Sequence, residues 1–156
     1  MHAHTALDGP AGTLRVSGAG LPPVELLRAP GTPADAHTPI GTRKAALLTL
    51  TVDGAPAVLR PSRGRLLRRS YRVDVRTGGF RYRLVPCSYA ESRLTRDGVR
   101  LGTLSSSGDG HVTDEWDADP TPLDLAVGTA LAAAFGTGAS PWWETLGDIV
   151  GELIAP

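Results

Sequence analysis

The sequence TPLDLAVGTALAAAFG at residues 121–136 has the signals of a helix that belongs in a protein interior. Thr121 suits the N-cap, Pro122 the first helical position, and Asp124 follows the cap by three residues. Gly136 is a typical residue at a helix end. Between these signals the side chains are small or apolar on every side, and a helix of this kind in a globular protein is buried all round. We predict a helix from Pro122 to Phe135 that the rest of the chain encloses.

The enclosing part is predicted to be β-structure. Short β-like segments, separated by Gly, Pro and Asp, occupy most of the chain before residue 120. They are Thr13–Ser17, Val24–Arg28, Ala45–Val52, Ala57–Leu59, Arg65–Arg76, Phe80–Cys87, Ser92–Arg96, Val99–Leu104 and His111–Trp116. This succession favours an antiparallel meander in a single β-rich domain over residues 13–156, mainly β with C-terminal helices. Residues 1–12 are small and polar, and we expect a flexible N-terminus there.

Two adjacent glycines, Gly78 and Gly79, mark a hairpin whose register can be predicted. A two-residue type I′ turn pairs Thr77 with Phe80. The apolar face then holds Tyr71, Val73, Val75, Phe80, Tyr82 and Leu84. The opposite face holds Arg72, Asp74, Arg76, Arg81, Arg83 and Val85. A three-residue turn would mix the two sets, so the pattern favours the two-residue turn.

The predicted register opposes charges on the polar face of this hairpin. Asp74 lies opposite Arg83, which is a favourable pair. Arg76 lies opposite Arg81, and like charges directly across a ladder are destabilising. Either these two side chains spread into water or an anion lies between them.

A second hairpin turns at Asp97-Gly98, and this turn would pair Leu94 with Leu101. The hairpin Arg93–Gly102, the acidic strand and loop around Trp116, and the apolar helix together resemble the tubby C-terminal-like superfamily, which includes LURP-one-related and phospholipid-scramblase-like proteins. The resemblance covers roughly residues 60–136. It implies a closed β-barrel around a central hydrophobic helix, and a non-enzymatic role in binding lipid or a protein partner. No site residue is carried over from the family, because no segment aligns with its known binding residues.

Charge is strongly divided along the chain, although the formal net charge is zero. Residues 60–100 contain twelve arginines and three acids, a formal charge of +9. Residues 101–156 contain nine acids and no lysine or arginine, a charge of −9. A charge distribution of this kind produces an electric field that influences which partners the protein associates with.

Arg72, Arg76, Arg81 and Arg83 are the candidate ligand-binding residues. Guanidinium groups bind phosphate and carboxylate in a forked geometry, so this face could hold an anionic ligand or a lipid headgroup. The alternative is a solvated strand face, in part neutralised by the acidic C-terminal third. Nucleic acid is disfavoured, because the pI is 6.9 and the aromatic residues of the hairpin lie on the other face.

A last helix is predicted over residues 141–154, after the start signal Ser140-Pro141. It is amphipathic and acidic, with Trp142 and Trp143 at its beginning. Tryptophan is enriched in interfaces, so this helix is a candidate for docking on a protein partner or a second copy of the chain. The alternative is packing against the arginine face of the same molecule.

No catalytic, cofactor or metal motif stands out. The run Ser105–Ser107 lacks the glycine pattern of a nucleophile elbow, and the acidic cluster after His111 matches no calcium loop. A single cysteine, Cys87, rules out an internal disulfide and suits a reducing compartment. The chain has no signal-like start and no apolar run of about 20 residues. We therefore expect a non-enzymatic cytoplasmic protein.

Overall fold

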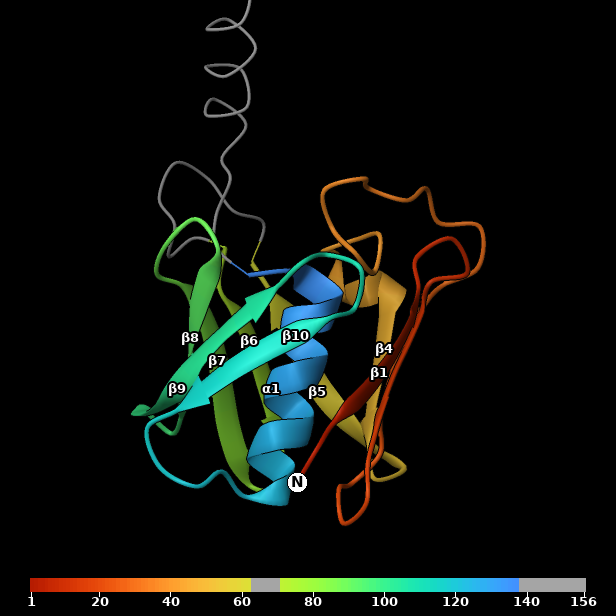
Figure 1. The fold of residues 1–156 in the computed structure, drawn as a ribbon. Helices are drawn as coiled ribbons and strands as arrows, with labels where there is room; N and C mark the ends of the chain where they lie inside the picture. The colour runs from red at the N-terminus through yellow and green to blue at the C-terminus, as the bar shows by residue number, and fades with distance from the viewer. Residues whose placement is uncertain (63–70, 138–156) are drawn as a thin grey trace, which may run out of the picture.

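The computed structural model describes residues 1–62 and 71–137, in which ten antiparallel strands form one sheet around a single α-helix (Figure 1). The strands are β1 His4–Asp8, β2 Thr13–Ser17, β3 Val24–Arg28, β4 Leu48–Val52, β5 Ala55–Pro61, β6 Val73–Thr77, β7 Phe80–Pro86, β8 Glu91–Arg96, β9 Val99–Ser106 and β10 Val112–Trp116. Their order in the sheet is their order in the chain. The predicted β-rich meander is therefore confirmed.

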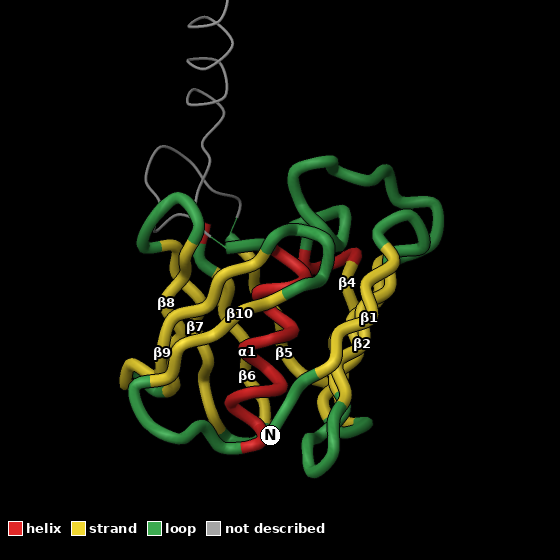
Figure 2. Tube along the Cα trace, viewed as in Figure 1, coloured by secondary structure: helices red, strands yellow, loops and turns green. Residues whose placement is uncertain are grey.

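The helix α1 spans Pro122–Phe135, as predicted. The Thr121 hydroxyl accepts the N–H of Asp124, and the Asp124 carboxylate accepts the N–H of Thr121, which completes a capping box. At the other end Gly136 has a φ of 74°, and its N–H donates to the carbonyl of Ala132. All residues from Asp124 to Phe135 are buried, and the strands surround the helix (Figure 2).

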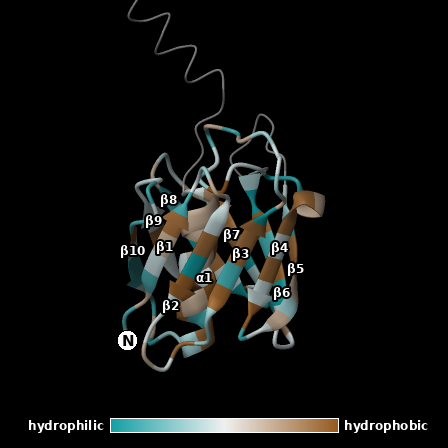
Figure 3. Ribbon diagram, turned by 90° about the vertical axis from the view of Figure 1, so that its right-hand side faces the viewer, coloured by the Kyte–Doolittle hydropathy of each residue, from teal (hydrophilic) through white to brown (hydrophobic). Residues whose placement is uncertain are grey.

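The inner faces of the strands form the core around α1. Val73, Val75, Tyr82 and Leu84 of the central hairpin are each at most 2% exposed, whereas the residues between them are half-buried or exposed. The alternation is visible as brown and teal along the strands in Figure 3. Because side chains alternate across a strand, burying one face turns the intervening arginines outward.

The closed barrel is not confirmed. The sheet curls around α1, but its pairing begins at β1 and ends at β10, and these two strands are not hydrogen-bonded neighbours. Thr5 Oγ1 donates to the carbonyl oxygen of Gly110, so the loop between β9 and β10 contacts β1. The structure is an open, curved sheet.

Two local predictions are corrected. Residues 4–8 pair with residues 13–17 as strand β1, so this part of the expected flexible terminus belongs to the sheet. Its signal is weak because Leu7 is the only large apolar side chain that it contributes. Leu94 pairs with Gly102 rather than Leu101, since the β8–β9 ladder contains a bulge between Leu94 and Thr95. Residues 63–70 and the predicted helix at 141–154 lie outside the described residues.

Candidate functional site

The site is built on the β6–β7 hairpin. Gly78 and Gly79 have φ angles of 58° and 80°, the left-handed conformation that a type I′ turn needs at both central positions. Thr77 pairs with Phe80, and the register along the hairpin is the predicted one. Pairs in an antiparallel ladder alternate between hydrogen-bonded and non-hydrogen-bonded. Since Thr77 and Phe80 flank the turn, Arg76 and Arg81 form a non-hydrogen-bonded pair, in which side chains come closest.

An open cavity of about 870 Å³ lies at this hairpin, and we call it the arginine groove. Its lining residues are Pro56, Arg76, Thr77, Gly78, Gly79, Phe80, Arg81, Arg83, Thr95, Asp97 and Gly98. Three of the four predicted ligand-binding residues therefore come together: Arg76, Arg81 and Arg83. The fourth, Arg72, does not line the groove; it lies before the start of β6, and its Nε is 3.7 Å from Oδ2 of Asp74.

Charge in the groove is unevenly balanced. Arg83 Nε donates to Asp74 Oδ1 at 2.7 Å, and this hydrogen bond raises the pKa of Arg83. Arg76 and Arg81 form no ion pair with an acidic residue of the described chain. The opposition of Arg76 and Arg81 predicted from the sequence is thus present, and neither of them forms an ion pair with an acid in residues 1–62 or 71–137.

A smaller cavity of about 230 Å³ adjoins the groove and shares Arg76 and Arg81 with it. It adds Arg60 and Asp74 to the charged groups at the site. Together the two cavities are lined by four arginines and two aspartates, a formal charge of +2. The lining of the site is therefore cationic, and its field favours anions over cations.

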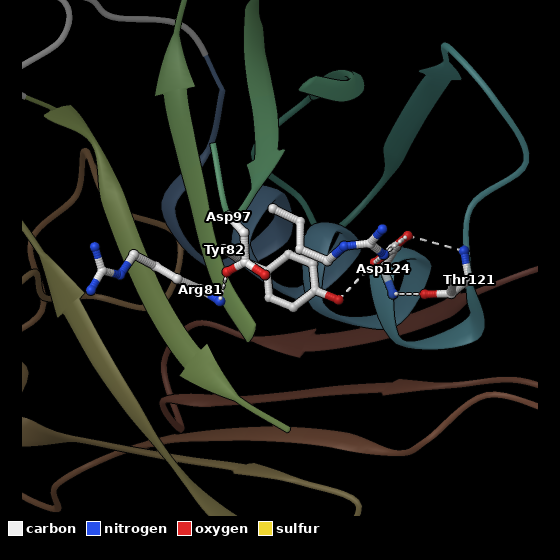
Figure 4. A network of polar contacts seen from close by, with 6 residues as sticks. Arg81, Tyr82, Asp97, Thr121 and Asp124 are labelled. Carbon is white, nitrogen blue, oxygen red and sulfur yellow. Dashed lines mark hydrogen bonds and ion pairs between the residues drawn. The ribbon is translucent and has the colours of Figure 1, made fainter. Parts of the chain in front are cut away.

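Asp97 holds the far side of the groove in place. Its Oδ1 accepts the backbone N–H of Arg81 at 2.9 Å, and its own N–H donates to the Arg81 carbonyl at 2.8 Å (Figure 4). In Figure 4 the Arg81 side chain points away from Tyr82, on the other side of β7. The β8–β9 turn is thereby attached to the strand that carries Arg81.

Phe80 is a site residue that the sequence did not indicate. It belongs to the apolar set of the hairpin, yet it is 39% exposed and lines the groove. The Arg96 guanidinium lies over its ring, 5.2 Å from the centroid, and the ring meets Tyr82 edge-on. It is the first residue of β7, beside the turn, where the hairpin ends. The only signal in the sequence was that position.

A buried carboxylate connects the site to the helix. Asp124 is 2% exposed and accepts hydrogen bonds from Tyr82 Oη, Arg96 Nη1 and Thr121 N–H (Figure 4). Burial acts to raise the Asp124 pKa, but these hydrogen bonds outweigh it and lower the pKa below its ordinary value. Burial and the bond to Asp124 raise the pKa of Tyr82, so its hydroxyl stays a donor. Arg96, fixed in this way, supports the Phe80 ring.

Comparison with family models, curated proteins and solved structures finds no match for this chain. The resemblance to the tubby-like superfamily therefore stays a prediction. Within the described residues no helix has the length and apolarity to cross a membrane. In the same residues no three His, Cys, Asp or Glu side chains gather as metal ligands would, so no metal centre is assigned there.

Proposed function

We propose that the protein is a non-enzymatic binding module that holds the phosphate group of an anionic ligand in the arginine groove. The observation that carries this proposal is the opposition of Arg76 and Arg81 across β6 and β7, with no acidic partner for either in the described residues. Both side chains line both cavities of the site.

The physical reason is the cost of the unliganded state. Two like charges at a non-hydrogen-bonded position repel each other, and they destabilise the ladder unless water screens them. An anion bound between them would replace that repulsion with two attractions. Charge-assisted hydrogen bonds from guanidinium to phosphate are among the stronger polar contacts in proteins. Arg83, already bonded to Asp74, would add less than Arg76 or Arg81.

The chemical groups that line the groove favour binding over catalysis. Its lining side chains supply guanidinium groups, the hydroxyls of Thr77 and Thr95, and one carboxylate, Asp97, which accepts a backbone N–H. None of the lining residues is a histidine, cysteine or lysine. These groups can hold an anion, but they offer no activated nucleophile with an adjacent base.

The test measures binding to two sources of phosphate. Vesicles of phosphatidic acid mixed with phosphatidylcholine, and vesicles of phosphatidylcholine alone, are co-sedimented with the protein at about 50 and 300 mM salt, a range over which screening increases markedly. Inorganic phosphate is titrated in a calorimeter for the soluble arm. If the protein binds anionic vesicles but not inorganic phosphate, the ligand is a lipid headgroup. If the protein also binds inorganic phosphate, the site accepts free anions.

The variant that decides the assignment is Arg76→Gln combined with Arg81→Gln. We expect it to weaken binding at least tenfold, because it removes two charge-assisted contacts. Arg93→Gln is the matched control, since Arg93 is exposed on β8 and does not line either cavity. Equal binding by the double variant and the wild type would overturn the proposal, as would no binding in either arm.

Self-assembly is the second candidate, and one observation favours it. Asp114 and Glu115 of β10 and the nearby Asp119 are exposed acids that form no ion pair within the described residues. A second copy could place this acidic strand against the arginine groove. Size-exclusion chromatography with light scattering tests this: a dimer at low salt that dissociates at high salt supports self-assembly, and a monomer at every salt concentration contradicts it.

A further inference from the structure

The arginine groove has an apolar side as well as a charged one. Phe80 is 39% exposed and lines the groove together with Pro56, while Val58, 48% exposed, lines the adjoining cavity. Val58 pairs with Arg76, which in turn pairs with Arg81, so the valine lies in the same row across the sheet. An exposed valine therefore borders Arg76 on its β5 side, and Phe80 adds an exposed aromatic ring to the lining of the groove.

The turn of the hairpin leaves the path between the two sides open. Gly78 and Gly79 carry no side chain, and a Cβ built on Gly79 meets no atom within 4 Å. The groove thus continues around the end of the hairpin, from the outward-pointing Arg76 and Arg81 to the ring of Phe80. The same cavity is therefore lined both by the arginines and by Phe80.

We propose that the ligand is a phosphate monoester with an aryl or alkyl substituent. Its phosphate lies between Arg76 and Arg81, and its substituent reaches past the glycine turn to Phe80 and Pro56. This inference rests on the proposed function and specifies its ligand class. It adds two requirements that anion binding alone does not contain: a second negative charge and an apolar group.

The charge of the lining favours a monoester over a diester. The two cavities carry a formal charge of +2, and Arg76 and Arg81, like Arg60 of the smaller cavity, form no ion pair within the described residues. A phosphate monoester carries about −1.5 to −2 at pH 7, whereas a diester carries a single charge. Only the monoester matches both arginines. Its second pKa is about 6, so its charge falls between pH 7 and pH 5. Arginine does not titrate in that range.

The apolar side of the groove determines how much affinity the substituent of the ligand is expected to add. Burying part of an aromatic ring against Phe80 and Pro56 removes apolar surface from water, and the gain is roughly proportional to the area removed. We expect phenyl phosphate to bind about tenfold more tightly than inorganic phosphate. Diphenyl phosphate has more apolar surface and less charge, and we expect it to bind more weakly than phenyl phosphate.

The experiment is calorimetric titration of the full chain with inorganic phosphate, phenyl phosphate and diphenyl phosphate, at pH 7 and pH 5 and low salt. The wild type is compared with Phe80→Ala and with Pro56→Ser, an exposed position that tests the same side if the first variant is unstable. Tyr89→Ala is the aromatic control, because Tyr89 is 63% exposed and lines neither cavity. Thermal unfolding checks that each variant is folded.

The expected result has three parts. Phenyl phosphate binds more tightly than inorganic phosphate, this preference falls in Phe80→Ala or Pro56→Ser but not in Tyr89→Ala, and monoester binding weakens several-fold from pH 7 to pH 5. Equal affinity for phenyl and inorganic phosphate, or equal affinity for phenyl and diphenyl phosphate, would overturn this inference. If phosphate still bound through Arg76 and Arg81, the proposed function would stand. Absence of binding by all three compounds and by anionic vesicles would overturn both.

Discussion

The hydroxyl of Tyr82 donates a hydrogen bond of 2.7 Å to Oδ1 of Asp124, joining the sheet to the first turn of the helix it surrounds. Both residues are at most 2% exposed. Arg96 binds the same carboxylate through Nη1, at 2.6 and 2.7 Å from its two oxygens. A carboxylate in an otherwise apolar helix is thereby satisfied, and the same contacts position Arg96 beside the groove residue Phe80.

Replacing Tyr82 with Phe tests the contribution of this hydrogen bond. Arg96 and the Thr121 N–H still bind Asp124 in the variant, so we expect a loss of about 1–2 kcal/mol rather than unfolding. Urea denaturation at pH 7 measures the free energy of unfolding. Tyr89→Phe, at an exposed position, is the control and is expected to change it by less than about 0.5 kcal/mol. A stability change in Tyr82→Phe no larger than in the control would contradict the prediction.

Asp124→Asn removes the charge and predicts a pH dependence. In the folded protein the pKa of Asp124 is lowered below its ordinary value of 3.8, so its charge stabilises the fold at all pH values above that value. The stabilisation is lost as the pH falls below 3.8 towards the folded-state pKa.

The measurement is urea denaturation of the wild type and Asp124→Asn at pH 7, 4.5 and 3. At pH 7 we expect the variant to be less stable by about 3 kcal/mol, because Arg96 loses its charged partner in a partly buried site. We expect the difference to be nearly unchanged at pH 4.5 and smaller at pH 3. A stability difference between the two proteins that grows as the pH falls would contradict a lowered pKa of Asp124 in the folded protein.

Gly128 brings the helix close to the sheet, and Gly128→Ala tests this contact. Alanine has the higher helix propensity by about 1 kcal/mol, which by itself would stabilise the variant. A Cβ at this position would lie 2.7 Å from Leu94 Cδ2 and 3.3 Å from Leu104 Cδ1, both in the core. We expect the clash to outweigh the propensity, with a net loss of about 1–2 kcal/mol in thermal or urea unfolding. An Ala variant more stable than the wild type would show that Leu94 can move aside.

The parts of the fold that could be predicted from the sequence are those with local causes. The limits of α1 follow from Thr121, Pro122 and Gly136, and the hairpin register follows from Gly78-Gly79, because each signal acts within a few residues. Whether β1 pairs with β10 depends on the curvature of the whole sheet, which no short segment specifies. The bulge in β8–β9 was missed for a similar reason. A Cβ on Gly102 would clash with the Glu115 carbonyl oxygen of β10, a constraint from a third strand.

The features of the candidate site also divide into those that local sequence signals predicted and those that they did not. Strand alternation correctly put Arg76, Arg81 and Arg83 on one face, but it could not show that Arg72 lies beyond the end of the groove. Phe80 was assigned by alternation to the apolar face, and its exposure goes with its position at the first residue of β7, beside the turn. The Arg96–Asp124 pair spans 28 residues, and a single acid in an apolar helix was its only trace in the sequence. How strands are placed side by side decides these features.

Asp97→Asn tests the electrostatic account of the groove without removing any arginine. Asp97 has a φ of 50°, which asparagine adopts readily, and an asparagine oxygen can still accept the N–H of Arg81. The substitution therefore keeps the turn while raising the formal charge of the lining from +2 to +3. A unit charge about 7 Å from a phosphate group of charge −1.5 to −2 interacts with it by about 0.9–1.2 kcal/mol in water, so we expect phosphate or phenyl phosphate to bind about five- to eightfold more tightly at low salt. The gain in affinity should shrink at about 300 mM salt because the added attraction is screened.

Calorimetric titration of the variant and the wild type at both salt concentrations measures this gain. Weaker binding by Asp97→Asn at low salt would mean that the carboxylate itself contacts the ligand, and that the groove does not act as a simple cationic site.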